Sequence, residues 1–411
     1  MSTNTGTAAG AVVIIGAGMA GYTAATQLRK LGHEDAITLV DAEPATYDRP
    51  PLSKNLFEED FRIEKLAFAT AEDLQTMHIE TRFGAQVMQI DPAAGEVVLA
   101  DGDTLRADTV IIAMGGSARE LPIPGADLPG VTTLRTFDDA LELRNSVTAG
   151  TRVAVVGAGL IGAELASALR LHGAEVTLID PMEIPLLPAV GELLATHLHA
   201  MHEPRGIRVV TGLTSEFAES DGGLVVKVQD GPEITVDRIV VGVGLVPNVE
   251  LAEAAGLDVD NGILVDETHR TSAPNVYAIG DVARTRDSAG TLHRREEHWE
   301  AAQLSGVEVA YAVLGQEIPA RGASWFWSDR HDCHLEATGR LSGPGVVVVR
   351  NAGDHPAVFL VEGGLLQGAA SVNDTQTVRA ARRLIDQRIP VAEGELADPN
   401  VSLRSLLKQK R

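Results

Sequence analysis

Two glycine-rich turns in this chain have the spacing G-x-G-x-x-G, which can bind the pyrophosphate of a dinucleotide. Each turn follows four apolar residues, 12–15 in the first copy and 153–156 in the second, and opens a segment of helical periodicity. The first glycine permits a tight turn, the second lets a pyrophosphate approach the backbone, and the third lets helix and strand pack closely. The helix N-terminus would supply N–H groups for the phosphates. The glycines are Gly16, Gly18 and Gly21, then Gly157, Gly159 and Gly162.

An acidic residue ends the next apolar segment in both copies, where a carboxylate can bind ribose hydroxyls. Asp41 lies 25 residues after the first glycine, with Glu43 just beyond it, and Asp180 lies 23 residues after Gly157. Glycine turns that merely pack helices on sheets would not explain these acids. Asp180 would repel a 2′-phosphate and residues 181–184 contain no arginine, so NADH is favoured over NADPH. Two redox nucleotides that exchange electrons are therefore predicted.

The composition of the whole chain agrees with an enzyme of several domains. Its 411 residues suggest two or three domains, and its net charge of −23 argues against nucleic acid as a general partner. The single cysteine, Cys333, excludes an internal disulfide or dithiol. No apolar run is long enough to span a membrane, and residues 1–5 lack the basic start of a signal peptide, so a cytoplasmic location is expected.

The periodicity of apolar residues also predicts the strands and helices that hold these glycines and acids in place. Strand, helix and strand alternate around both glycine turns, which predicts an α/β fold with two parallel sheets. We expect strands at 12–15, 37–40, 153–156 and 176–179, and helices at 19–31 and 163–171. Near the C-terminus, short runs at 345–349, 357–361 and 365–370, a turn at 354–356 and a helix-like segment at 375–387 predict a small α+β domain.

The chain resembles the FAD- and NADH-dependent ferredoxin reductases that serve bacterial aromatic-ring dioxygenases and class I cytochrome P450s. Those proteins have a glutathione-reductase-like fold with two Rossmann-like dinucleotide-binding domains. The resemblance implies a discontinuous FAD domain (11–120 and 246–318), an NADH domain (121–245) and a C-terminal α+β domain (319–411). Besides the double fingerprint, it rests on segments 47–54, 113–116, 241–248, 278–283, 297–302 and 325–329.

The resemblance also implies roles for individual residues. The first fingerprint would hold FAD, with either Asp41 or Glu43 on its ribose, and the second would hold NADH together with Asp180. Lys54 would lie at the reactive edge of the flavin, and Glu164 would lie near the nicotinamide and could pair with Lys54; these two are the candidate catalytic residues. The remaining candidate FAD contacts are Arg49, Asp281, Trp299 and Trp327.

Each of these roles has a plain structural alternative. Lys54 and Arg49 could be solvated surface residues, and Glu164 could simply favour a helix start. Asp281 could cap the following helix, and the tryptophans could be ordinary core aromatics. The sequence leaves these readings open.

The implied reaction passes a hydride from NADH to FAD and then single electrons to a [2Fe–2S] ferredoxin. Such ferredoxins are usually acidic, so an acidic reductase would need a local basic patch for docking, although a solvated, salt-bridged surface is an equal reading. Candidates for the patch are Arg284, Arg286, Arg294, Arg295, Arg321 and Arg330.

Other functions of the same fold differ mainly in the electron acceptor. Rubredoxin reductases and monodehydroascorbate-type reductases cannot be separated from this reading by sequence. Disulfide reductases need a cysteine facing the flavin, and Cys333 is far from residues 51–54, where they carry it. A flavin-binding signalling or DNA-binding protein of this fold is disfavoured, because DNA binding needs a positive surface and the net charge is −23. A metal site at residues 331–334 is disfavoured because alternate side chains of a strand point in opposite directions, and the histidines at 197, 199 and 202 are expected to be solvated.

Overall fold

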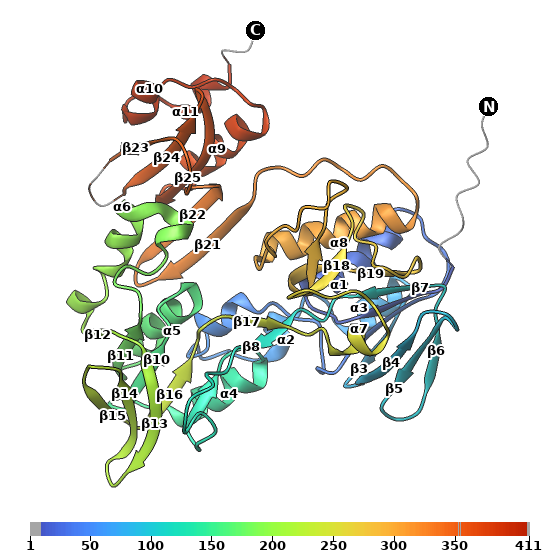
Figure 1. Cartoon of the computed structure of the whole chain (residues 1–411), viewed down its shortest axis with the longest axis horizontal. Coiled ribbons are helices and arrows are strands. Elements are labelled where there is room, and N and C mark those ends of the chain that lie inside the picture. Colours follow the sequence, from blue (N-terminus) through green and yellow to red (C-terminus); the bar gives the residue numbers. More distant parts are fainter. Residues whose placement is uncertain (1–9, 352, 354, 409–411) are drawn as a thin grey trace. The chain divides into compact units, whose positions relative to one another are not determined.

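The structure, a computed structural model, describes residues 10–351, 353 and 355–408 (Figure 1). Residues 1–5, read above for a signal peptide, and residue 354 of the predicted turn lie outside this range. Within the described range, no helix combines the length and the apolar character needed to cross a bilayer.

The described chain forms two compact units, each built from several segments. The first unit comprises the described residues up to 49, then 62–117 and 245–321. The second comprises 50–61, 118–244 and the described residues from 322 onward.

A five-stranded parallel sheet forms the centre of the first unit, in the order β19-β7-β1-β2-β3. Because side chains alternate across a strand, Val12 and Ile14 of β1 face helices α1 and α8, whereas Val13 and Ile15 face a second sheet, β4-β5-β6. The bounds are β1 Val12–Ile15, β2 Ile37–Asp41, β3 Ile79–Phe83, β7 Thr109–Ile112, β19 Val276–Ala278, β4 Val87–Asp91, β5 Glu96–Leu99, β6 Thr104–Arg106, α1 Met19–Lys30 and α8 Trp299–Val313.

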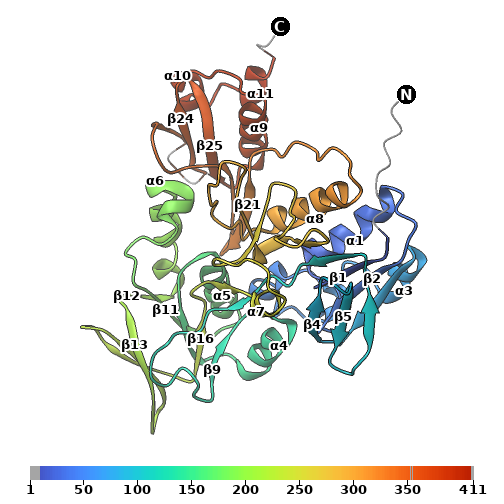
Figure 2. The same ribbon diagram turned by 45° about the vertical axis from the view of Figure 1, so that its right-hand side comes forward.

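Helices α1 and α8 lie side by side, which Figure 2 also shows. Small residues at the crossing allow the close approach: a Cβ on Gly306 would lie 2.5 Å from the carbonyl oxygen of Ala20. Shorter elements of this unit are α2 Ile63–Leu66, α3 Ala71–Thr76, α7 Glu250–Ala254, η3 Gly280–Val282, β17 Leu245–Pro247, β18 Ile263–Val265 and β20 Ala283–Thr285.

The second unit contains another five-stranded parallel sheet, in the order β12-β11-β10-β16-β9. An antiparallel sheet, β13-β14-β15, shares a core with it. The bounds are β9 Val131–Thr133, β10 Arg152–Val156, β11 Glu175–Asp180, β12 Arg208–Thr211, β13 Thr214–Ser220, β14 Gly223–Val228, β15 Glu233–Val236, β16 Arg238–Val241, α4 Phe137–Ser146, α5 Leu160–Leu171, α6 Leu187–His199, η1 Pro50–Ser53 and η2 Glu203–Arg205. Strand β8, Gly116–Ala118, lies at a boundary between the units.

The C-terminal part of the second unit is an antiparallel sheet in the order β21-β22-β25-β24-β23, and helix α9 packs on it. Apolar and small residues of α9 (Ala380, Ala381 and Leu384) join Phe359 in the core there. The bounds are β21 Trp325–Arg330, β22 Cys333–Gly339, β23 Val346–Arg350, β24 Ala357–Glu362, β25 Leu365–Val372, α9 Thr375–Asp386, α10 Glu393–Ala397 and α11 Leu403–Leu406.

The predicted fold class is confirmed: two parallel α/β sheets of the dinucleotide-binding type and a C-terminal α+β domain. The predicted strands and helices form, although the second fingerprint helix begins at Leu160 rather than at residue 163. The division into three domains remains a prediction. The two compact units differ from these predicted domains. Segment 50–61 packs with the second unit, where η1 contacts α5, and the predicted NADH and C-terminal domains fall almost entirely within that same unit.

Candidate functional site

The two glycine turns have nearly identical backbone geometry. Gly16 and Gly157 adopt φ values of +106° and +105°, which L side chains rarely adopt. A Cβ on Gly21 would lie 1.9 Å from the carbonyl oxygen of Gly16, and the equivalent distance from Gly162 to Gly157 is also 1.9 Å. By contrast, a Cβ on the middle glycine of either turn, Gly18 or Gly159, would meet no atom within 4 Å. Each turn therefore leaves open the space where a pyrophosphate would approach.

The helices that follow these turns, α1 and α5, begin without a side-chain cap and without an acidic residue in the first turn. Helices α3 and α4 instead begin with capping boxes, formed by Thr70 with Asp73 and by Thr136 with Asp139. The uncapped N–H groups of α1 and α5 remain available to a phosphate. This fits the predicted nucleotide sites.

The two acids at the strand ends make matching hydrogen bonds. Asp41 Oδ2 accepts from the N–H of Ala17 at 2.5 Å, and Asp180 Oδ2 accepts from that of Ala158 at 2.7 Å. The other oxygen of each carboxylate accepts from the N–H two residues later, at 2.8 Å. Burial raises the pKa of the Asp41 carboxyl, and these N–H groups oppose the rise. Besides any ribose contact, each acid thus holds its glycine turn against the sheet.

In the first unit, side chains of segment 47–49 are held by hydrogen bonds to Glu43, just after β2, and to Trp299, the first residue of α8. Arg49 forms a 2.5 Å ion pair with Glu43, which also accepts a hydrogen bond from the Tyr47 hydroxyl. Trp299 Nε1 donates to Asp48 at 2.7 Å. Although burial opposes it, charge interactions with Tyr47 and Glu43, together with the hydrogen bond to Glu43, raise the pKa of Arg49. Arg49 is therefore not a simple solvated guanidinium.

Asp281 lies in η3, shortly after β19, and is partly buried. Its carbonyl oxygen accepts a hydrogen bond from Arg295 at 2.8 Å. Because β19 and β1 belong to the same parallel sheet, Asp281 and the first glycine turn lie at the same, carboxyl edge. This edge is where open α/β sheets bind ligands.

In the second unit, Lys54 Nζ and Glu164 Oε2 form a 2.9 Å ion pair. The side chains are 16% and 4% exposed, so the pair is largely shielded from water. Two serines also donate hydrogen bonds to the Glu164 carboxylate: Ser53 Oγ donates to Oε2 at 2.5 Å, and Ser328 Oγ donates to Oε1 at 2.6 Å. Glu164 is therefore an anchored acid, not merely a favourable charge at a helix start.

Aromatic residues of β21 lie next to this ion pair. The Trp327 ring centroid is 6.0 Å from Lys54 Nζ, and Trp327 stacks on Trp325 with a centroid distance of 5.0 Å. Both tryptophans are partly exposed. The structure therefore brings Lys54, Glu164 and Trp327 together, and their roles toward a flavin stay predictions.

Arg330 is 4% exposed, so the expectation that it belongs to a surface patch for docking is wrong. Arg330 and Ser328 lie on the same face of β21, and Arg330 Nη2 donates to Ser328 Oγ at 2.9 Å. The serine hydroxyl in turn donates to Glu164. Sequence reasoning missed Ser53 and Ser328 as partners of Glu164, and the residue types of 325–330 carry no local signal for the burial of positions 328 and 330.

The other five arginines considered for docking fall into two groups, those held in ion pairs and those exposed to solvent. Arg295 is 6% exposed, Arg284 bonds to Asp260, and Arg321 bonds to Glu296 and Glu308. These three arginines are held in internal ion pairs. Arg286 and Arg294 are exposed and remain candidates for a docking patch.

His202 is buried, which contradicts the prediction of solvated histidines near the end of α6. It is 1% exposed, and its Nδ1 lies 3.0 Å from Nε2 of His331 at the β21–β22 turn. Burial, reinforced by nearby positive groups, lowers the pKa of His202 to about 3 and that of His331 to about 4. This neutral pair ties the C-terminal hairpin to the segment between α6 and η2.

The histidine pair predicts a loss of stability in mild acid. The unfolded chain binds protons on both imidazoles near pH 6.5, whereas the folded chain binds them only near pH 3–4. The contribution of these two histidines to the free energy of unfolding is therefore fully present above pH 6.5 and is lost as the pH drops toward 4, by up to about 1.4 kcal/mol per pH unit for each histidine. His331→Asn suits the left-handed backbone at this position (φ +48°). Denaturant unfolding between pH 4.5 and 7 should show a shallower pH slope for this variant, and equal slopes would contradict the assignment.

Comparisons with known proteins cover almost the whole chain. Residues 10–306 match the family model described as pyridine nucleotide-disulphide oxidoreductase, and residues 325–407 match the model described as reductase C-terminal. Rhodocoxin reductase of Rhodococcus erythropolis is 36% identical over 96% of this chain and 93% of its own length. The benzene 1,2-dioxygenase system ferredoxin–NAD(+) reductase subunit of Pseudomonas putida is 34% identical over 97% of both chains.

Solved structures give a similar picture. The reductase in the covalent putidaredoxin reductase–putidaredoxin complex has a TM-score of 0.90 and 31% identity, over 97% of this chain and 98% of that chain. The ferredoxin reductase for the CYP199A2 system of Rhodopseudomonas palustris has a TM-score of 0.91 and 33% identity, over 96% and 99%.

Proposed function

This chain belongs to the pyridine nucleotide-disulphide oxidoreductase family, and from that premise we propose that it is an NADH-dependent, FAD-containing ferredoxin reductase. It takes a hydride from NADH and delivers single electrons to a [2Fe–2S] ferredoxin of a dioxygenase or cytochrome P450 system. The observation that carries the proposal is the pair of open glycine turns, each followed by an uncapped helix. Full-length relatives named as reductases of ferredoxin support the acceptor.

In this proposal, residues of the first unit hold FAD. The turn Gly16, Gly18 and Gly21 and the start of α1 bind its pyrophosphate, with Asp41 or Glu43 on the adenosine ribose. Arg49, Asp281 and Trp299 contribute further FAD contacts. The bound flavin supplies the chemistry, because it accepts two electrons at once and releases them singly.

Residues of the second unit hold NADH and tune the reaction. The turn Gly157, Gly159 and Gly162 binds the pyrophosphate of NADH, and Asp180 binds the ribose. Lys54 would hold a positive charge near the part of the flavin that gains negative charge, and Glu164 with its two serines keeps Lys54 in place. Trp327 would lie beside the bound flavin and would help to exclude water. The single cysteine leaves this chain without a dithiol for a disulfide acceptor.

NADPH is expected to be a poor donor. The Asp180 carboxylate is fixed by two N–H groups at the place of the ribose, and residues 181–184 carry no arginine to neutralise a 2′-phosphate. Repulsion between like charges costs several kcal/mol, so kcat/KM for NADPH should be at least about 100-fold lower than for NADH. Steady-state kinetics with both donors measures this, and equal values would contradict the proposal.

The central experiment is cytochrome c reduction by the purified protein with NADH, with and without a bacterial [2Fe–2S] ferredoxin. Strong dependence on ferredoxin is the expected result. If NADH reduces the flavin but turnover stays slow with ferredoxin, the acceptor is wrong, and rubredoxin is tested next.

A further inference from the structure

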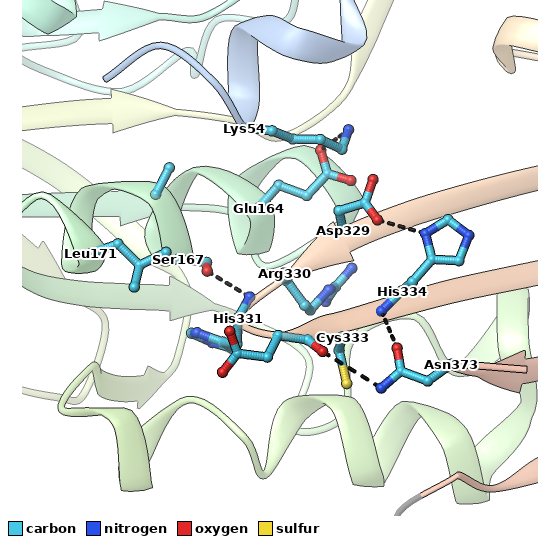
Figure 3. Close-up of a pocket in the computed structure, with 12 residues that line it drawn as sticks. Lys54, Glu164, Ser167, Leu171, Asp329, Arg330, His331, Cys333, His334 and Asn373 are labelled. Atoms are coloured by element: carbon cyan, nitrogen blue, oxygen red, sulfur yellow. Dashed lines mark hydrogen bonds and ion pairs between the residues drawn. The ribbon is translucent and has the colours of Figure 1, made fainter. Parts of the chain in front are cut away.

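A cavity of about 330 Å³ lies within the second unit, between helix α5 and the β21–β22 hairpin (Figure 3). Its size is at the lower end of the range of about 300–1,000 Å³ for small-molecule sites. Figure 3 shows Arg330 in the middle of its lining residues, with Lys54 and Glu164 on one side and Cys333 on the other. The charges of this wall decide what can bind there.

Most charged groups of the wall already have a partner. Lys54 pairs with Glu164 at 2.9 Å. Asp329 pairs with His334 at 2.6 Å, and the hydrogen bonds of His334 to Asp329 and Glu336 outweigh burial and raise its pKa. Asp332 is exposed, so water solvates its charge. These groups contribute no net buried charge to the cavity.

Arg330 is the exception within the described lining. Its side chain is 4% exposed, yet the guanidinium forms no ion pair there and makes one hydrogen bond, to the neutral hydroxyl of Ser328. Its Nε is buried and has no hydrogen-bond partner among the described residues. Among the nearby carboxylates, Glu164 has the strongest charge interaction with Arg330. However, the Glu164 carboxylate already accepts hydrogen bonds from Lys54 and from two serines. A buried, unpaired cation is costly, and an anion in the cavity would compensate it.

We propose that this cavity binds a small organic carboxylate, with the Arg330 guanidinium as the anchor for the carboxylate group. The planar guanidinium has several N–H donors in a fork that matches two carboxylate oxygens. The wall also offers an apolar side, formed by Ala168 and Leu171 on α5, and Leu171 is 78% exposed. A short hydrocarbon chain would cover that surface. The ligand is therefore a short-chain carboxylate, and its site is distinct from both glycine turns.

Titration calorimetry of the full-length holoprotein with sodium butyrate, at constant ionic strength and with saturating NAD⁺, tests this directly. One butyrate per chain is expected. Acetate should bind more weakly, by about fourfold for each methylene that it lacks. Arg330→Met should weaken butyrate binding at least about tenfold, because a charge-assisted pair is lost. Arg294→Met, which removes an exposed arginine, is the matched control and should leave binding unchanged.

A second variant keeps the test decisive if Arg330→Met does not fold. Leu171→Glu changes an exposed residue at the cavity rim and adds a negative charge, so it should also weaken butyrate binding. The proposal is overturned if chloride binds as tightly as butyrate, if NAD⁺ displaces butyrate, or if Leu171→Glu binds like the unchanged protein. No outcome depends on electron transfer, so failure here leaves the proposed reductase function untouched.

Discussion

Gly18→Ala is expected to give a folded protein that has lost most of its flavin. Gly18 has φ −66°, which alanine adopts without strain, and a Cβ there would meet no protein atom within 4 Å. The added methyl group would instead occupy the space of the pyrophosphate. An overpacked contact costs about 1–3 kcal/mol, so FAD affinity should fall about 10- to 100-fold. The flavin-to-protein absorbance ratio and a flavin titration of the apoprotein measure this change.

The same substitution in the second turn is the matched control. Gly159 has φ −64° and the same open surroundings. Gly159→Ala should keep its flavin and lose affinity for NADH by a similar factor. If either variant loses the other nucleotide, or if both keep both nucleotides, the assignment of the two turns is wrong.

The second large effect is expected at the buried ion pair. Lys54→Met removes the cation and leaves the Glu164 carboxylate, 4% exposed, with only neutral donors directly bonded to it. Breaking a buried pair in this way costs about 3–5 kcal/mol. Flavin reduction by NADH should also slow at least about tenfold, because a preorganised positive charge is lost. Denaturant unfolding measures the loss of stability, anaerobic stopped-flow absorbance measures the reduction rate, and flavin potentiometry shows whether the flavin potential shifts as well.

A double-mutant cycle separates the pair from its surroundings. Lys54→Met combined with Glu164→Gln should be less destabilised than the sum of the single variants, because the double variant has no carboxylate at position 164 to be left without its cation. Lys30→Met, at the exposed end of α1, controls for the loss of a lysine. An unchanged reduction rate together with an unchanged potential would leave Lys54 with a structural role alone.

Sequence reasoning was strongest where the chemistry is local. Gly16 and Asp41 lie 25 residues apart in one strand–turn–helix–strand unit, so their types and spacing predicted both the turn and the acid at the strand end. What the spacing could not show is that Asp41 bonds the N–H of Ala17, because that depends on the relative height of two neighbouring strands. The resemblance suggested the pairing of Lys54 with Glu164, although these residues are 110 positions apart.

The partners of that pair were missed for a physical reason. Ser328 reaches Glu164 only after the C-terminal sheet has packed on α5, 164 residues away in the sequence. The same packing buries Arg330, so a residue that looks like a surface cation becomes an interior one. His202 is similar, since its burial depends on the His331 turn. Long-range packing, rather than local pattern, set each of these environments.

The order in which the ribosome makes the two units has consequences for folding. The chain passes between the units after residues 49, 61, 117, 244 and 321. In the first unit, β7 pairs with β19, yet β19 begins 164 residues after β7 ends. At about 5–20 residues per second, that strand follows roughly 8–30 s later. During synthesis the nascent chain therefore exposes an open sheet edge along β7, the kind of edge that invites aggregation. Chaperone binding to chains stalled between residues 117 and 276 should be strongest at this edge.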